Sequence, residues 1–232
     1  RRVLFRSHDQ PMIHVDRRVG PELQAWLDKA TASGFLPEEQ TLGKAISSHA
    51  KDGIFDLHLF PVCSSDQTSR LHGQVRIEVA CMTPKSRGSM HITSKDPTSL
   101  PTIDHNYLGD EEGLDAAVLA EGVTLANELF DHPALSSVLG EPITDTSAES
   151  YLRDHVAHYY HPVGTCKMGL DDDAVCDPNG LVRGLQRVSV ADCALMPQIP
   201  RANTNLPAVM AGIRVAQRSE ERRVGKECRS RW

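Results

Sequence analysis

The chain has 232 residues, with 25 Lys and Arg against 31 Asp and Glu, and a formal net charge of −6. This length allows one large domain or two small ones. Binding to nucleic acid needs clustered Lys and Arg, so the acidic balance argues against a nucleic-acid partner. A membrane span is not expected, because no apolar run approaches the roughly 18 residues that cross a bilayer.

The two ends of the chain differ from the sequence between them. The head RRVLFRS, residues 1–7, and the tail RSEERRVGKECRSRW, residues 218–232, are similar to translated sequencing-adapter DNA. We therefore expect both to be artefacts and exclude them from the fold. The alternative is a genuine basic tail that binds nucleic acid or an acidic surface. Without the ends, residues 8–217 hold 16 basic and 28 acidic residues, a net charge of −12.

The first half of the chain is predicted to contain one helix and several strands. Residues 19–32 place apolar side chains at helical spacing and end before Gly34, which indicates an amphipathic helix. Extended segments are predicted at 55–62, 75–84, 89–94 and 101–108. The short turn KSRG, which holds Gly88, favours a hairpin between the second and third of these segments.

The second half is predicted to contain three helices and a short strand. The strongest helix is expected at 110–130, where apolar residues share one face and acidic residues crowd the first turn. A second helix is expected from the capping box Thr146–Glu149 to His158. A short apolar strand at 187–197 and a last helix at 207–217 follow. Strands and helices in this order predict the α+β class.

The cysteines form no paired pattern. Five remain when Cys228 in the tail is set aside: Cys63, Cys81, Cys166, Cys176 and Cys193. An odd, scattered set without a C-x-x-C pair favours reduced thiols over a disulfide framework. We therefore expect a cytoplasmic protein.

The stretch YYHPVGTCKMG, residues 159–169, is the first candidate for chemistry. Pro162 fixes its own φ and biases His161 away from helix, so this imidazole should leave a helix end with little freedom. It could act as a base, bind a metal or end the helix. His155 and His158 could join it in a metal site, but no second Cys or His pair completes a zinc set, and we expect no metal.

A second candidate lies 44 residues further on, in NTNLPAVMAGI. Asn205 stands just before a predicted helix with Pro207 in its first turn. The start of a helix presents unpaired N–H groups that stabilise negative charge. A base and such a helix start together suit the oxidation of an alcohol. A helix-terminal His and a plain Asn cap remain the alternative reading of the same residues.

Three ordered blocks carry a resemblance to a known family. HPVGTCKMG, DPNGLVRGLQRVSVADCALMP and NTNLPAVMAGIRVA resemble the C-terminal signature of the glucose–methanol–choline (GMC) flavin oxidoreductases, closely over residues 159–216. The stretch SRGSMHITSKDPTSLPTIDHNYLGD resembles that family's substrate domain more loosely. The resemblance implies a flavoprotein that oxidises an alcohol to a carbonyl by proton abstraction and hydride transfer to FAD.

The same resemblance implies roles for individual residues. His161 matches the catalytic base, and Asn205 matches a second active-site position that is His or Asn in the family. Asp192, Cys193, Asn205 and Pro207 match positions where the chain passes FAD, although the family usually has Ala at position 193. The implied partners are a small-molecule alcohol and an electron acceptor, either oxygen or a quinone-like carrier.

The family binds FAD through an N-terminal βαβ unit with the motif G-x-G-x-x-G, and this motif does not occur here. We therefore expect a fragment with an antiparallel-sheet substrate domain and a C-terminal strand and helix that return to an α/β flavin-binding domain missing from this chain. The expected parts are artefacts at 1–7 and 218–232, a partial substrate-binding domain at 8–158, and the active-site motif with the return segment at 159–217. A small metal-binding module or a non-catalytic interaction domain is the alternative.

Overall fold

The computed structural model describes residues 5–34, 41–64, 66, 68–148 and 150–229. The chain divides into two compact units, each built from segments distant in sequence. The first unit comprises residues 1–10, 86–107 and 160–232, and the second comprises 11–85 and 108–159. Residues 8–10 and 86–107 thus join 160–217 in the first unit, while the expected functional parts at 8–158 and 159–217 stay a prediction. One reason for this joining is backbone pairing, since His8 and Val163 exchange N–H···O bonds of 3.0 and 2.8 Å.

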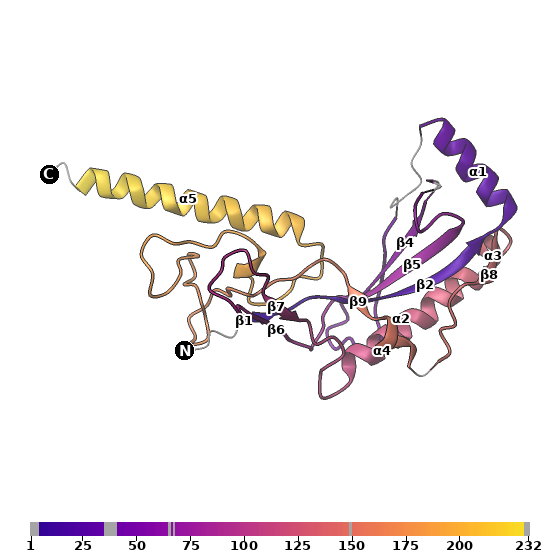
Figure 1. The fold of residues 1–232 in the computed structure, drawn as a ribbon, viewed down its shortest axis with the longest axis horizontal. Helices are drawn as coiled ribbons and strands as arrows, with labels where there is room; N and C mark the ends of the chain where they lie inside the picture. The colour runs from indigo at the N-terminus through magenta and orange to yellow at the C-terminus, as the bar shows by residue number, and fades with distance from the viewer. Residues whose placement is uncertain (1–4, 35–40, 65, 67, 149, 230–232) are drawn as a thin grey trace. The chain divides into compact units, whose positions relative to one another are not determined.

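The second unit is built on an antiparallel sheet in the order β3-β4-β5-β2-β8, with β9 also paired to β2. Helix α2 (Leu114–Asp131) runs across one face of this sheet (Figure 1) and contacts β5, β2 and β4. The antiparallel sheet packed with helices confirms the predicted α+β class. The strands are β2 (Pro11–Val19), β3 (Gly43–Ala45), β4 (Leu57–Cys63), β5 (Gln74–Cys81), β8 (Leu139–Pro142) and β9 (Ala157–His158).

The core of this unit lies between α2 and the sheet. The inward face of α2 is apolar apart from Asp115, and it packs on inward-facing strand residues. Of the residues expected to share one face, Val118 is buried, Leu114 and Leu125 are half-buried and Leu129 is 41 % exposed, so the predicted face is only partly right. The predicted start at residue 110 is four residues early, because Gly113 is left-handed at φ 65° and Asp110 accepts the N–H of Leu114 at 2.6 Å. The buried helix residues are Val118, Leu119, Val123, Ala126 and Phe130, and the strand residues include Ile13, Val15, Leu57, Ile77 and Val79.

The predicted hairpin between 75–84 and 89–94 is wrong. Strand β5 pairs with β2 and β4, whereas β6 (Gly88–His91) lies in the first unit between β1 (Phe5–Ser7) and β7 (Thr102–Asp104). After β5 the chain is tied to α2, since the buried carboxylate of Asp115 accepts the Lys85 N–H at 2.7 Å. This bond directs the chain away from the sheet instead of letting it fold back on β5.

The predicted helix from 146 to 158 is much shorter in the structure. Helix α4 spans only Tyr151–His155, and Val156 is extended at ψ 132°. The chain then forms β9, which pairs His158 with Pro11. Pairing with the free edge of β2 therefore overrides helix propensity here. Glu149 of the expected capping box lies outside the described residues.

The other helices follow the predictions with changes at their ends. Helix α1 (Pro21–Ala32) confirms the helix expected at 19–32, and α3 (Pro133–Ser136) is a short turn after α2.

The strand expected at 187–197 is wrong: a 3₁₀ turn, η1 (Cys193–Leu195), forms because Asp192 Oδ1 accepts the Ala194 N–H at 2.8 Å. Among the described helices, none has the length and apolar content needed to cross a bilayer.

Helix α5 (Asn205–Arg229) is longer than the expected 207–217 and continues into the tail. At the other end, β1 uses the last residues of the head, Phe5–Ser7, and pairs with β6. The origin of the head and tail as adapter stays a prediction, because a short strand and a helix extension form on foreign sequence as readily as on native sequence.

Gly122 provides a test of the packing between α2 and the sheet. A Cβ at this position would lie 2.4 Å from Val79 Cγ1 and 2.9 Å from Leu57 Cδ2. Alanine favours a helix over glycine by about 1 kcal/mol, but overpacking a core costs about 1–3 kcal/mol. We expect Gly122→Ala to lower the free energy of unfolding in urea. Adding Val79→Ala should recover part of that loss, and a net gain from Gly122→Ala alone would contradict the close packing.

Candidate active site

The motif at 159–169 runs beside the segment that contains η1, within the first unit. Gly164 N–H donates to Cys193 O at 3.2 Å, Cys166 N–H to Ala194 O at 2.9 Å and Met168 N–H to Leu195 O at 2.8 Å. Two of the blocks that carried the family resemblance are therefore joined by backbone hydrogen bonds. The third block is joined through Cys193, whose Sγ donates to Thr204 O at 3.3 Å, immediately before Asn205.

His161 is turned into the interior of this unit. Tyr160 before it is left-handed, at φ 62°, and leaves its own ring exposed, while the His161 side chain is only 6 % exposed. Helix α4 ends six residues earlier, so the expectation that His161 leaves a helix end is wrong. The turn at Tyr160, and not a helix end, aims the imidazole inward.

The imidazole of His161 is anchored at one nitrogen. Its Nδ1 lies 2.7 Å from Gln10 Oε1, and its backbone N–H donates to Asp9 Oδ1 at 3.0 Å. Burial lowers the pKa of His161 below its usual 6.5, and the nearby Asp9 carboxylate opposes this shift with a smaller effect. The ring is therefore neutral at pH 7, as a general base must be.

Asp9 is a buried carboxylate that organises the residues around His161. Its Oδ1 also accepts the Gln10 N–H at 2.9 Å, and its Oδ2 accepts the Tyr107 hydroxyl at 2.6 Å. His105 stacks on the Tyr107 ring, with centroids 5.0 Å apart. Burial and the Asp9 carboxylate raise the pKa of Tyr107, so its hydroxyl stays protonated and donates. These hydrogen bonds compensate for burying the charge.

Sequence reasoning missed Asp9, Gln10 and Tyr107. Gln10 lies 151 positions from His161, and Tyr107 lies 98 positions from Asp9. No local pattern marks such partners, because spacing rules describe neighbours on one element. A hint was present in HDQ at residues 8–10, where polar residues precede a buried apolar strand.

The residues expected to contact a flavin lie at two places, at η1 and at the start of α5. Asp192 is exposed and caps η1, Cys193 is half-buried, and Asn205 is exposed at the start of α5 with Pro207 two residues later. The carbonyl of Thr204 accepts the Ala208 N–H at 2.9 Å, so Thr204 and not Asn205 occupies the position before the helix. This leaves the Asn205 amide available at the surface of the unit.

The first turns of α5 carry an exposed apolar stripe. Its four residues recur at the spacing of one helix face, and each is more than half exposed. An apolar face of this kind is normally covered by protein or ligand. It therefore fits a helix whose N-terminal end packs against further structure beside a bound group. The residues are Leu206, Val209, Met210 and Ile213.

Two of the three histidines in the metal-binding alternative, His155 and His158, lie in the second unit. His155 Nδ1 pairs with Tyr151 O at 3.0 Å and its ring stacks on Tyr151, while His158 lies on β9. Among the described residues, no three His, Cys, Asp or Glu side chains are grouped to hold a metal ion.

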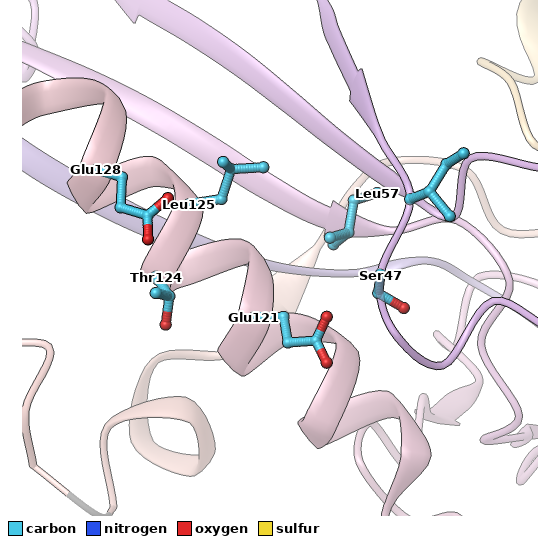
Figure 2. A pocket seen from close by; sticks show the side chains of 7 residues that line it. Ser47, Leu57, Glu121, Thr124, Leu125 and Glu128 are labelled. Atoms are coloured by element: carbon cyan, nitrogen blue, oxygen red, sulfur yellow. The ribbon is translucent and has the colours of Figure 1, made fainter. Parts of the chain in front are cut away.

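A pocket of about 290 Å³ lies in the second unit, between α2 and the segment around β3 and β4 (Figure 2). One of its two carboxylates is already engaged, since Glu121 accepts the Ser48 N–H at 2.8 Å and the Ser48 hydroxyl. These bonds lower the pKa of Glu121. None of the expected site residues lines the pocket, which is formed by Ile46, Ser47, Leu57, Glu121, Thr124, Leu125 and Glu128.

Comparison with known proteins agrees with this geometry. The sequence profile of the family described as GMC oxidoreductase matches residues 84–212. The oxygen-dependent choline dehydrogenase of Citrobacter koseri is 34% identical over 210 residues, which cover 86% of this chain and 37% of that protein. The chain thus spans little more than a third of that relative.

Solved structures share the fold. A variant of formate oxidase from Aspergillus oryzae, studied for FAD modification, superposes with a TM-score of 0.76 at 19% identity, over 94% of this chain and 47% of that one. Pyridoxine 4-oxidase from Mesorbium loti superposes with a TM-score of 0.68 at 16% identity, over 93% and 42%. The profile match covers more than half of the chain and includes His161, Asn205 and the segments joined around η1. The chain therefore belongs to the GMC oxidoreductase family.

Proposed function

We propose that this chain supplies the substrate-binding and C-terminal parts of a flavoprotein that oxidises a CH–OH group to a carbonyl. The observation that carries this proposal is His161, a buried and neutral imidazole anchored at Nδ1 within the family's motif. Its Nε2 would take the proton of the substrate hydroxyl. The Asn205 amide would hydrogen-bond the substrate oxygen, but it cannot exchange protons, so His161 carries the acid–base work alone.

FAD is the cofactor that fits the exposed start of α5. The N–H groups of the first turn and the helix dipole favour negative charge, and the apolar stripe beside them fits a covered surface. Asp192, Cys193, Asn205 and Pro207 would hold the cofactor from this side. When bound, FAD supplies the acceptor for the hydride. The names of the relatives, a choline dehydrogenase and oxidases, support a small alcohol as substrate and oxygen as electron acceptor.

A cytoplasmic location stays part of this proposal. It rests on the scattered cysteines, of which Cys63, Cys81, Cys166, Cys176 and Cys193 are free thiols.

The first test of the proposal is flavin binding. The 232-residue chain alone is expected to bind FAD weakly, because it lacks the glycine-rich turn that holds the pyrophosphate. Joined in one polypeptide to a G-x-G-x-x-G flavin domain of the family, it should retain FAD in equimolar amount. Without oxygen, addition of a small alcohol should then bleach the flavin absorbance. Equimolar FAD on the isolated chain, or no bleaching with any of a panel of alcohols, would contradict the proposal.

A further inference from the structure

Gln10 connects His161 to a backbone carbonyl on a distant segment. Its side chain is completely buried. Nε2 of Gln10 lies 2.9 Å from Pro200 O, and Oε1 lies 2.7 Å from His161 Nδ1. The backbone N–H of Gln10 is bound to Asp9, the same carboxylate that accepts the backbone N–H of His161. Asp9 thus accepts the backbone N–H groups of both Gln10 and His161, and Pro200 O accepts the Gln10 side chain. Together these bonds hold the Gln10 amide against the imidazole.

The direction of each hydrogen bond follows from the chemistry of the partners. A carbonyl oxygen only accepts, so the Gln10 atom facing Pro200 must be the NH₂ group. The other end of the amide is then an oxygen, which also only accepts. Nδ1 of His161 must therefore carry a hydrogen and donate. In a neutral imidazole the second nitrogen, Nε2, then holds the lone pair. In the reverse orientation the Gln10 NH₂ could donate to a bare Nδ1 of His161, but its oxygen would face the Pro200 carbonyl, and two buried acceptors set against each other are costly.

We propose that Gln10 is a positioning residue that fixes His161 in the Nδ1–H tautomer, so that Nε2 is the nitrogen that gains and loses the proton. The link to catalysis rests on the proposed function, but the tautomer itself does not. Protonation of Nε2 leaves the bond from Nδ1 to Gln10 intact, so the ring can cycle between its two states without moving. A neutral amide also avoids the strong rise in basicity that a carboxylate at this position would cause.

The tautomer can be measured directly on the 232-residue chain without flavin. Long-range ¹H–¹⁵N spectra distinguish the protonated from the bare ring nitrogen, and His161→Gln identifies the signals. At pH 8 we expect His161 to be almost wholly the Nδ1–H tautomer. His132 provides an internal contrast, because its Nδ1 accepts the Ala134 N–H at 3.3 Å and its hydrogen must lie on Nε2. A wild-type His161 with the hydrogen on Nε2, or with both forms in comparable amounts, would overturn the proposal.

Substitutions separate the role of the acceptor from simple packing. Gln10→Met keeps the volume and removes the acceptor, so the Nδ1–H preference should be lost. Gln10→Glu keeps an oxygen at the same place and should retain it. Gln186→Met, an exposed glutamine of the same unit, is the matched control and should change nothing. If Gln10→Met folds, as judged by the backbone amide spectrum, and still shows only Nδ1–H, Gln10 does not position the ring.

The kinetic consequence is measured in the flavin-loaded protein. Gln10→Met should slow flavin reduction roughly 10- to 100-fold, as loss of other partners that orient a histidine does, while Gln10→Glu should restore part of the rate. The two proposals fail in different ways. If His161 is not the base, removing it leaves the rate unchanged whatever the tautomer. If Gln10 has no role, the tautomer and the rate are both indifferent to Gln10→Met.

Discussion

Replacing His161 with alanine in the flavin-loaded protein should slow flavin reduction by substrate by about two to four orders of magnitude, the usual contribution of a general base. The imidazole is buried and anchored at Nδ1, and its removal takes away the base of the proposed reaction. Anaerobic stopped-flow mixing with substrate measures this step directly. Asn205→Ala should have a milder effect, because it removes one hydrogen bond to the substrate oxygen.

The control for this result is His158→Ala, which removes an exposed imidazole three residues earlier on β9. Its rate should match that of the wild type. The wild-type rate should also rise with pH through the pKa of His161 and stay level above it, because only the neutral ring accepts a proton. Burial lowers that pKa and Asp9 is the charged group opposing the shift, so the midpoint should lie below pH 6.5. A near-wild-type rate for His161→Ala would remove the base assignment.

Truncating Phe130 should cause the largest loss of stability in the second unit. The ring is 1 % exposed, belongs to the core between α2 and the sheet, and lies under the Arg17 guanidinium at 5.6 Å from the ring centroid. Phe→Ala substitutions in cores typically cost about 3–5 kcal/mol. We expect Phe130→Ala to lower the free energy of unfolding by about this amount in a urea titration.

The neighbouring Leu129 is a suitable comparison, because it lies on the same helix turn but is 41 % exposed. Leu129→Ala should cost well under about 1 kcal/mol, as surface substitutions usually do. Equal losses for the two variants would mean that α2 does not present the observed face to the sheet. The slope of the urea titration should stay the same in both variants, which shows that stability and not the denatured state has changed.

The features that sequence predicted well are those that depend on neighbouring residues. The existence of α2 follows from apolar positions three and four residues apart, and the family signature is read from short blocks such as that around His161. The fold class followed from the order of such elements. Local patterns were also sufficient to mark Asn205 at the start of the last helix.

The features that sequence missed depend on partners far away in the chain. The local sequence favours a hairpin between β5 and β6. In the structure, however, Lys85 N–H binds Asp115 and β6 pairs with β1 instead of with β5. The helix expected up to His158 lost to pairing with β2. Gln10 looks like any polar residue beside a strand, and only the folded chain shows that it faces His161.

The first unit is assembled from three segments that lie far apart in the sequence, and this constrains the order in which the protein folds. During synthesis the second unit can complete its sheet as soon as residue 159 has left the ribosome, since all its segments are then present. About 150 further residues must be synthesised before His161 can contact Gln10 and Asp9. Contacts of such separation form slowly, because a long loop has to close first. We therefore expect the carboxylate of Asp9 to be enclosed late, so that assembly of the first unit is the step most exposed to misfolding.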